Sequence, residues 1–535
     1  ILLIFFVMGA EGYPRSTLIL YYFFNIILTS FSRIAVRVYY SHYYDKILIK
    51  KNINTKKLIL IGAGKTGAKI TREVLNTSGE KYSIVGFADD DSEKQGALLH
   101  GVKVLCKVVD IPNLKIEYDE VLITAPSATG GQIRHIIKAC KQTGKRYKIV
   151  PGLNELLDKD ISLETIRDVS YQDILGREEV KLNMNSIEKL LLGKRILITG
   201  AGGSIGSELV NQCLKFSPAE IICLDQSEEK IFELDQKYKN SRFKTIIKTV
   251  LASINNKMIL EKAFLENQPN IVFHAAAYKH VPIQELHPWN AVQTNIKGSL
   301  NLITLSDKYK VNKFVLVSTD KAVNPVNVMG ATKRIAEKLV QSFNKGSDTC
   351  FMSVRFGNVL GSSGSAIPIF QNQINSGRPI TITHPEMSRY FMSIQEASQL
   401  ILQCGAYGKD GEIFLLEMGN PIKIVQMAKD MIRLSGLEPE VDIPIVFTGL
   451  RPGEKLYEEL RLTEEIKVPT EHQRIVILKE EKIPEPWESL NQRIQALIKV
   501  SEQLDLDNII FSLKNILPSY QPRGFGSNEI PSNNL

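Results

Sequence analysis

The stretch that decides the fold is Lys194–Asp225, KRILITGAGGSIGSELVNQCLKFSPAEIICLD. An apolar run leads into Gly200, Gly203 and Gly206, and a second apolar run ends on Asp225. Glycines at this spacing let the backbone turn tightly and approach a pyrophosphate, while the N-terminus of the following helix points at the phosphate. The stretch therefore predicts a strand, a helix and a second strand that together bind a dinucleotide.

The acid at the end of this stretch selects between two cofactors. Asp225 comes nineteen residues after Gly206, near the spacing typical of an acid that binds a ribose 2′-hydroxyl. Because its charge would repel a 2′-phosphate, the sequence predicts NAD rather than NADP. A glycine-rich turn without a ligand is the alternative that three glycines alone leave open.

Length, charge and cysteine content exclude several classes of protein. A chain of 535 residues is too long for one core and predicts roughly three or four structural units. Six scattered cysteines without a CxxC pair are typical of reduced thiols, and their spacing predicts no metal site. The net charge of +8 comes without basic runs interleaved with aromatic residues, so we expect no nucleic-acid partner.

The N-terminal residues 1–38 predict a transmembrane region that is truncated at its start, because no Met precedes the apolar residues 1–7. Ser16–Ser32 is an apolar run of seventeen residues interrupted by Asn25. As a helix it would be about 25 Å long, enough for a short span. Lysines and arginines gather on its C-terminal side, so the positive-inside rule places the rest of the chain in the cytoplasm. A cleaved signal peptide or a buried helix are the alternatives.

Apolar runs and glycine turns divide the rest of the chain. Residues 57–152 repeat the pattern with Gly62, Gly64 and Gly67 and predict a first Rossmann-like domain, regulatory or scaffolding in role. A nucleotide-binding site is the alternative for this domain. Residues 153–193 are predicted as a linker, and 194–475 as the catalytic domain with a smaller substrate lobe at its C-terminal end. Residues 476–535 predict two amphipathic helices and a disordered polar tail. The predicted fold class is thus α/β, with two doubly wound parallel sheets after the N-terminal segment.

Side chains that can carry chemistry follow the strand predicted near 313–317. Ser318, Thr319, Asp320 and Lys321 come directly after it, and ligands of a doubly wound sheet lie at this edge. Lys333 follows Met329 by four residues, so on a helix both side chains point to one side. A solvated charge pair of little energetic weight is the alternative for Asp320 and Lys321.

Five motifs in order resemble the extended short-chain dehydrogenase/reductases. Within that superfamily, the chain is similar to the membrane-bound nucleotide-sugar 4,6-dehydratases, the CapD-like polysaccharide biosynthesis proteins. The motifs are GAGGSIGSE (200–208), HAAAYKHVP (274–282), STDKAVNPVNVMGATKR (318–334), RFGNVLGSSGS (355–365) and GLRPGEKLYEEL (449–460). The N-terminal segment and the first, CoA-binding-like domain match the long form of this family. The resemblance implies a location at the bacterial inner membrane and self-association.

The implied reaction converts UDP-N-acetylglucosamine to a 4-keto-6-deoxy sugar for capsule, O-antigen or glycan synthesis. C4 of the sugar is oxidised by NAD, a proton from C5 and the hydroxyl of C6 leave as water, and the hydride returns to C6 while C5 takes up a proton, so NAD ends as it began. The resemblance implies that Lys321 is the C5 base and Asp320 the C6 acid. For that role Lys321 must be partly neutral near pH 7, which burial and a nearby cation such as the nicotinamide or Lys333 would favour.

The complete predicted site has three parts. The catalytic residues are Thr319, Asp320, Lys321, Met329 and Lys333. The cofactor-binding residues are Gly200, Gly203, Ser204, Ile205, Gly206, Asp225, Ser253, Ala275, Ala276, Ala277 and Lys333. The substrate-binding residues are Lys279, His280, Arg355, Asn358, Arg389 and Arg451. The arginines are included because a guanidinium suits a diphosphate, Asn358 as a hydrogen-bonding partner, and Lys279 and His280 because they follow a strand end close to the catalytic residues. Surface ion pairs are the alternative for the arginines, and a packing role is the alternative for His280.

Two positions depart from the wider superfamily. Met329 stands where the YxxxK tyrosine is usual, and a thioether cannot exchange a proton. The long dehydratases share this methionine, and Thr319, water or Lys333 would then assist at the C4 hydroxyl. At Ser253 an acid is more usual beside the adenine. A C4 epimerase of the same fold and a membrane-tethered NAD-binding regulator without turnover are the alternative functions.

Overall fold

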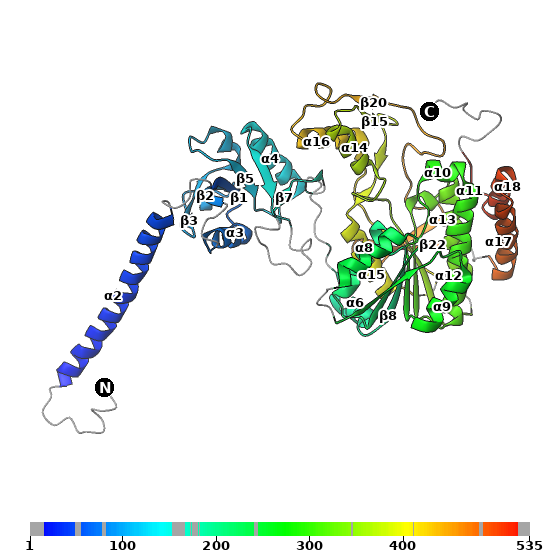
Figure 1. The fold of residues 1–535 in the computed structure, drawn as a ribbon, viewed down its shortest axis with the longest axis horizontal. Helices are drawn as coiled ribbons and strands as arrows, with labels where there is room; N and C mark the ends of the chain where they lie inside the picture. Colours follow the sequence, from blue (N-terminus) through cyan, green and yellow to red (C-terminus); the bar gives the residue numbers. More distant parts are fainter. Residues whose placement is uncertain are drawn as a thin grey trace. The chain divides into compact units, whose positions relative to one another are not determined.

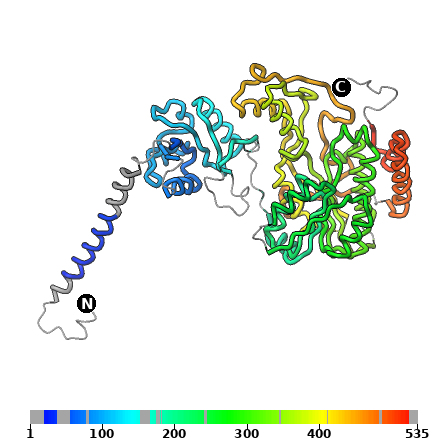
Figure 2. Tube along the Cα trace, viewed as in Figure 1, coloured from blue at the N-terminus to red at the C-terminus, as the bar shows by residue number. Residues whose placement is uncertain are grey.

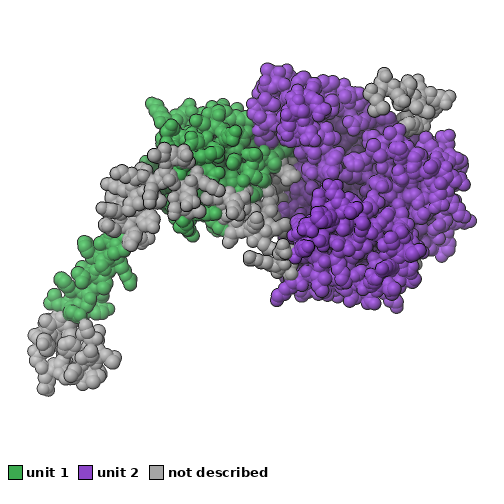
Figure 3. Space-filling model, viewed as in Figure 1, with its two compact units in different colours: residues 1–176 green, residues 177–535 purple. Residues whose placement is uncertain are grey.

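The computed structural model describes residues 15–48, 55–76, 82–151, 166–171, 173, 180, 182–239, 244–343, 346–409, 411–480 and 485–522. The chain divides into two compact units, Ile1–Gly176 and Arg177–Leu535 (Figure 3). The remaining residues are not described, and they include most of the predicted linker and of the predicted disordered tail.

The first unit contains helix α2 and a Rossmann-like domain (Figure 1). Its described sheet has the order β3-β4-β2-β1-β5-β6-β7, with β1 parallel to both β2 and β5. This confirms the predicted parallel α/β arrangement, and β7 extends the domain beyond residue 152. The elements are α2 (Arg15–Leu48), β1 (Lys56–Ile61), α3 (Lys65–Asn76), β2 (Tyr82–Ala88), η1 (Ser92–Lys94), β3 (Leu98–Leu99), β4 (Val102–Cys106), η2 (Val108–Asn113), β5 (Glu120–Ile123), α4 (Gly130–Gln142), β6 (Arg146–Ile149) and β7 (Arg167–Asp168).

The predicted membrane span requires a correction. Across the described ranges, no helix combines the length and the apolar character needed to cross a membrane. The apolar run at 16–32 is diluted by polar residues, among them Asn25 and Thr29, and Arg33 follows directly after it. The placement in the inner membrane that rested on this span was therefore wrong.

The second unit is built on a nine-stranded sheet in the residues described, with the order β10-β9-β8-β11-β12-β13-β18-β22-β21. The strands from β10 to β18 run parallel, and β22 and β21 join antiparallel at one edge. From β8 the chain adds β9 and β10 in one direction along the sheet, and from β11 it adds β12 and β13 in the other. The strand order therefore reverses between β8 and β11. In open α/β sheets a ligand binds outside the carboxyl ends of the strands at such a point.

Helices cover both faces of this sheet (Figures 1 and 2). One buried cluster joins α9, α12, α13, α17 and α18 to the sheet, and another joins α6, α7, α8 and α15 to its opposite face. The elements up to α13 are α6 (Met184–Leu191), β8 (Arg195–Thr199), α7 (Ser204–Leu214), β9 (Glu220–Asp225), α8 (Glu228–Lys239), β10 (Ile246–Leu251), α9 (Lys257–Asn267), β11 (Ile271–His274), α10 (Val281–Leu286), α11 (Pro288–Ala291), η5 (Val292–Gly298), α12 (Ser299–Lys308), β12 (Lys313–Val317), η6 (Asp320–Ala322) and α13 (Val328–Phe343).

The C-terminal part of the unit contributes both to the sheet and to a smaller lobe. The lobe contains α14, α16 and the pair β15-β20 (Figure 1). The remaining elements are β13 (Cys350–Arg355), β14 (Asn358–Val359), α14 (Ala366–Asn375), β15 (Ile380–Ile382), β16 (Ser388–Arg389), β17 (Phe391–Met392), α15 (Ile394–Tyr407), β18 (Ile413–Leu416), β19 (Ile422–Lys423), α16 (Ile424–Leu434), β20 (Ile445–Phe447), β21 (Glu465–Pro469), β22 (Ile475–Glu480), α17 (Trp487–Glu502) and α18 (Leu506–Ile516).

Both predicted boundaries of the catalytic domain differ from the structure. Strand β22 pairs with β18, so the main sheet continues past residue 475. Leu490 and Leu513 of the two C-terminal helices are fully buried in the core of the unit. At the other end, Ile187 and Leu191 of α6 are also fully buried, so part of the predicted linker belongs to the second unit.

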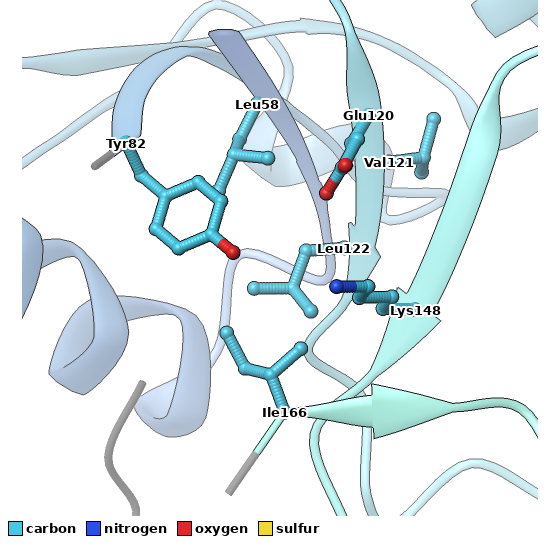
Figure 4. Close-up of a pocket in the computed structure, with 7 residues that line it drawn as sticks. All are labelled: Leu58, Tyr82, Glu120, Val121, Leu122, Lys148 and Ile166. Carbon is cyan, nitrogen blue, oxygen red and sulfur yellow. The ribbon is translucent and has the colours of Figure 1, made fainter. Parts of the chain in front are cut away.

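A small cavity in the first unit lies beside β1, β5 and β6 (Figure 4). Its volume is about 10 Å³, which leaves space for about one water molecule. Leu58 and Glu120 are near the amino ends of β1 and β5, so the cavity lies away from the glycine turn that follows β1. It is too small for a nucleotide.

Candidate active site

The glycine turn after β8 has the form that a dinucleotide requires. Gly200 turns the chain with a φ of +67°. A Cβ on Gly206 would lie 2.0 Å from the carbonyl oxygen of Gly200, so only glycine lets α7 begin this close to the strand. The N–H groups at the start of α7 are thereby held next to the turn, where they can bind phosphate.

The carboxylate of Asp225 lies beside this turn. Its Oδ2 accepts a hydrogen bond from the N–H of Gly202 at 2.9 Å, and its Oδ1 accepts one from the N–H of Ser227 at 3.0 Å. These bonds fix the carboxylate at the carboxyl end of β9, where it could accept from a ribose hydroxyl. Together, the turn and the acid fit the predicted NAD.

The other predicted cofactor residues follow neighbouring strands. Ala276 contacts the glycine turn, because a Cβ on Gly200 would lie 2.7 Å from its backbone nitrogen. Ala275 and Ala277 flank it after β11. The hydroxyl of Ser204 accepts from the N–H of Ser363 at 3.2 Å, which ties α7 to the loop after β14. Ser253 is half-buried after β10, and its hydroxyl accepts from the N–H of Asn255 at 3.3 Å.

The predicted catalytic residues meet at the carboxyl end of β12. The hydroxyl of Thr319 donates to Asp320 Oδ1 at 3.0 Å. Lys321 Nζ donates to the same Asp320 oxygen at 3.0 Å and to Asn358 Oδ1 at 3.1 Å. Asn358 comes from β14, so two separate segments hold the lysine. The predicted acid and base are therefore in direct contact.

A second carboxylate, which the sequence did not reveal, lies beside Lys321. Glu458 Oε1 is 3.7 Å from Lys321 Nζ. Burial by itself would lower the pKa of Lys321, but the charges of Asp320 and Glu458 outweigh burial and raise it. Lys321 is therefore an ammonium ion in this structure. The expectation of a partly neutral lysine was wrong, because its nearest charged neighbours are carboxylates.

Helix α13 approaches Lys321 closely at its first turn. A Cβ on Gly330 would lie 2.2 Å from the carbonyl oxygen of Lys321, so glycine is required for this contact. The preceding residue, Met329, is buried. Lys333 lies one turn further along, and burial lowers its pKa to about 8, against the opposing charge of Glu337. Lys333 can therefore exchange a proton near neutral pH.

Arg355 belongs to a buried ion-pair network and not to the substrate site. Its side chain is completely buried, with Nη2 2.8 Å from Glu337 and Nη1 2.8 Å from Glu465. Glu337 also accepts from the hydroxyl of Ser318 at 2.6 Å, just before the catalytic residues. Burial would raise the pKa of Glu337, but the arginines lower it to about 2. The predicted role of Arg355 in substrate binding was wrong, because carboxylates of the protein engage its guanidinium.

The other predicted substrate residues differ in their surroundings. Arg389 donates to the backbone carbonyls of Lys455 at 2.6 Å and Leu456 at 3.0 Å, so it anchors residues 449–460 instead of presenting a free guanidinium. Arg451, in the same segment, is exposed and stays a predicted phosphate ligand. Lys279 and His280 are also exposed, after β11.

Comparison with known proteins identifies the family. The family model described as polysaccharide biosynthesis protein matches residues 196–480. The chain belongs to this family. A second model, described as CoA-binding domain, matches residues 1–151.

Two related proteins and one solved structure show how much of this polysaccharide biosynthesis family member is similar to known proteins. Capsular polysaccharide biosynthesis protein CapD of Staphylococcus aureus is 44% identical over 84% of this chain and 75% of its own. UDP-glucose 4-epimerase of Rickettsia rickettsii is 34% identical over 52% of this chain and 80% of its own. The X-ray structure of Pen from Bacillus thuringiensis is 35% identical, with a TM-score of 0.50, and covers 56% of this chain and 93% of its own.

Sequence reasoning missed two buried residues of this family member's site. Glu458 was quoted within a motif but received no role. Asn295 lies in the π-helical turn η5, accepts from the N–H of Tyr278 at 2.9 Å and donates to Thr332 on α13 at 3.0 Å. It therefore ties the loop after β11 to the helix that carries Met329 and Lys333. A π-helical turn often occurs at functional sites but has no simple sequence signal.

Proposed function

We propose that this protein is an NAD-dependent nucleotide-sugar 4,6-dehydratase of polysaccharide biosynthesis, with UDP-N-acetylglucosamine as substrate. The contact between Asp320 and Lys321 at the carboxyl end of β12 carries the proposal. Loss of water from C6 requires one group that removes a proton and another that donates one. The relatives support the broader class, a nucleotide-sugar modifying enzyme of polysaccharide biosynthesis.

The two catalytic groups can reach the required protonation states by one proton transfer. In the structure, Lys321 is an ammonium ion 3.0 Å from Asp320 Oδ1. If the proton moves from Nζ to Oδ1, an N–H bond breaks and an O–H bond forms. The result is a neutral amine that can take the C5 proton and a carboxylic acid that can protonate the leaving C6 hydroxyl.

The C4 hydroxyl must lose its proton without a tyrosine. Thr319 is hydrogen-bonded to Asp320, and its hydroxyl could relay this proton. Lys333, with a pKa of about 8, is the second group able to exchange a proton on this side of the site. NAD, when bound, supplies the reversible two-electron oxidation of the sugar. The residues of the chain orient the sugar and move its protons.

A C4 epimerase is the second candidate function. It is favoured by the similarity to a relative named UDP-glucose 4-epimerase. Epimerisation needs oxidation, rotation and reduction at C4, and it gives the Asp320–Lys321 pair no task at C5 and C6. The pair therefore favours dehydration.

The test is to incubate the full chain with NAD and UDP-N-acetylglucosamine and to analyse the sugar nucleotide by mass spectrometry and NMR. A product lighter by one water, absent with Asp320→Asn and with Lys321→Met, supports the dehydratase. A product of unchanged mass that is the C4 epimer supports the epimerase. NAD binding without any product refutes both enzymes and supports a regulator.

A further inference from the structure

Glu458 is buried in the site, although neither the predicted mechanism nor the proposed function uses it. Its side chain is 4% exposed. Oε1 lies 3.7 Å from Lys321 Nζ and 3.7 Å from Arg389 Nε. Among the described residues, Oε2 has no hydrogen-bond partner. A buried carboxylate with an unsatisfied oxygen is costly, which suggests a task in the site.

The segment that carries Glu458 is fixed against the catalytic residues. Residues 449–460 are held by the two bonds from Arg389 described above. Lys455 Nζ donates to the carbonyl of Val323 at 2.9 Å, two residues after Lys321. Asn327, before α13, donates to the carbonyl of Gly453 at 2.9 Å. Glu458 therefore occupies a determined position beside Lys321.

The neighbouring Glu459 has a different environment. Its side chain is 53% exposed, and Oε2 lies 3.4 Å from Lys455 Nζ. It also accepts from Asn324 at 3.0 Å. No ion pair between Glu459 and Lys321 is found among the described residues. Glu459 is therefore a matched control for the charge of Glu458.

The charges around Lys321 come from three elements. Asp320 lies on η6, Glu458 on the 449–460 segment and Arg389 on β16. The arginine opposes the two carboxylates, and Asn358 is neutral. Without Glu458, the negative charge of Asp320 and the positive charge of Arg389 would balance around the Lys321 ammonium ion. Glu458 therefore supplies the excess negative charge. An opposite charge within about 4–6 Å shifts a pKa by roughly 1–3 units.

We propose that Glu458 is a positioning residue that controls where Asp320 and Lys321 hold their shared proton, and thereby sets the pH range of the reaction. The inference rests on the proposed function for its link to turnover. Lys321 Nζ lies 3.0 Å from Asp320 Oδ1, and the reaction needs one proton held between these two groups. A negative charge beside the pair favours every protonated form. Removal of that charge therefore moves both the acidic and the alkaline limb of the profile of reaction rate against pH to lower pH.

The first experiment measures the titration of Lys321 without turnover. The full chain is labelled briefly with acetic anhydride at a series of pH values, and acetylation of Lys321 is quantified by peptide mass spectrometry. We expect Glu458→Gln to lower the half-labelling pH by roughly one to two units. Glu459→Gln should leave it unchanged, and Glu458→Asp should restore most of the wild-type value. An unchanged half-labelling pH in Glu458→Gln overturns the inference.

The second experiment measures water loss from UDP-N-acetylglucosamine against pH. Glu458→Gln should move both limbs to lower pH, whereas a merely structural role would lower the rate at every pH and move neither limb. A labelling shift in a protein that never releases water refutes the proposed function and leaves the inference intact. Water loss with unshifted labelling and unshifted limbs refutes the inference and leaves the function intact.

Discussion

Replacement of Glu337 by glutamine tests the buried network behind the carboxyl end of β12. The change removes the charge that Arg355 and Arg334 share at 2.8 and 3.0 Å. The pKa of Glu337 is about 2 against an ordinary 4.5. At about 1.4 kcal/mol per pKa unit, this difference corresponds to about 3 kcal/mol of stability. Removal of one partner of a buried pair costs a similar amount, about 3–5 kcal/mol.

The sign of the pH dependence follows from the lowered pKa. The contribution of Glu337 is complete above pH 4.5 and is lost as the pH falls towards 2. The stability difference between wild type and Glu337→Gln should therefore be about 3 kcal/mol at pH 7 and should shrink in acid.

The assay is urea unfolding followed by tryptophan fluorescence. Both tryptophans, Trp289 and Trp487, lie in the second unit, so the signal reports the unit that contains the network. Glu386→Gln is the control, because both Glu386 and its partner Lys423 are exposed to solvent, and an exposed ion pair contributes little to stability. Equal losses in the two variants, or a Glu337→Gln loss that does not shrink in acid, would refute the reasoning.

Three further outcomes are expected. Gly206→Ala should abolish NAD binding in calorimetry, because its Cβ would lie 2.0 Å from the oxygen of Gly200; Gly64→Ala, with no atom within 4 Å of its Cβ, should leave it unchanged. Gly330→Ala should lower turnover about 100-fold or more while NAD still binds, since it displaces the backbone of Lys321, the proposed base, and a small misplacement in an active site can have this effect. The pKa of buried His274 is lowered to about 3 by burial. Stability should therefore fall below pH 6.5 by up to about 1.4 kcal/mol per pH unit, and His274→Gln should reduce this slope in acid unfolding curves.

The local parts of the site were predictable from the sequence. Gly206 and Asp225 belong to one strand-helix-strand unit, in which a fixed spacing determines their geometry. Thr319, Asp320 and Lys321 are adjacent in the chain, so a single strand end brings them together. Met329 and Lys333 are four residues apart on one helix, α13, which begins at Val328.

The parts that depend on distant contacts were not predictable. A sequence shows that Arg355 and Arg389 are cations, but not whether a phosphate, a carboxylate or a backbone carbonyl will meet them. Glu458 reaches Lys321 only because the 449–460 segment folds back onto the carboxyl edge of the sheet. The pKa of Lys321 is raised by Asp320, its neighbour in the chain, and also by Glu458, whose contribution could not be deduced from adjacent residues.

The edge strands β22 and β21 have a consequence for biosynthesis. The last strand to enter the sheet ends at Glu480, and two further helices complete the core. While the ribosome is still translating these residues, β18 has not yet paired with β22. The face of the sheet that α17 and α18 cover is then still partly exposed. The first unit can fold during synthesis, because all its strands precede residue 176. We therefore expect the second unit to become protease-resistant only after its C-terminal helices have left the ribosome.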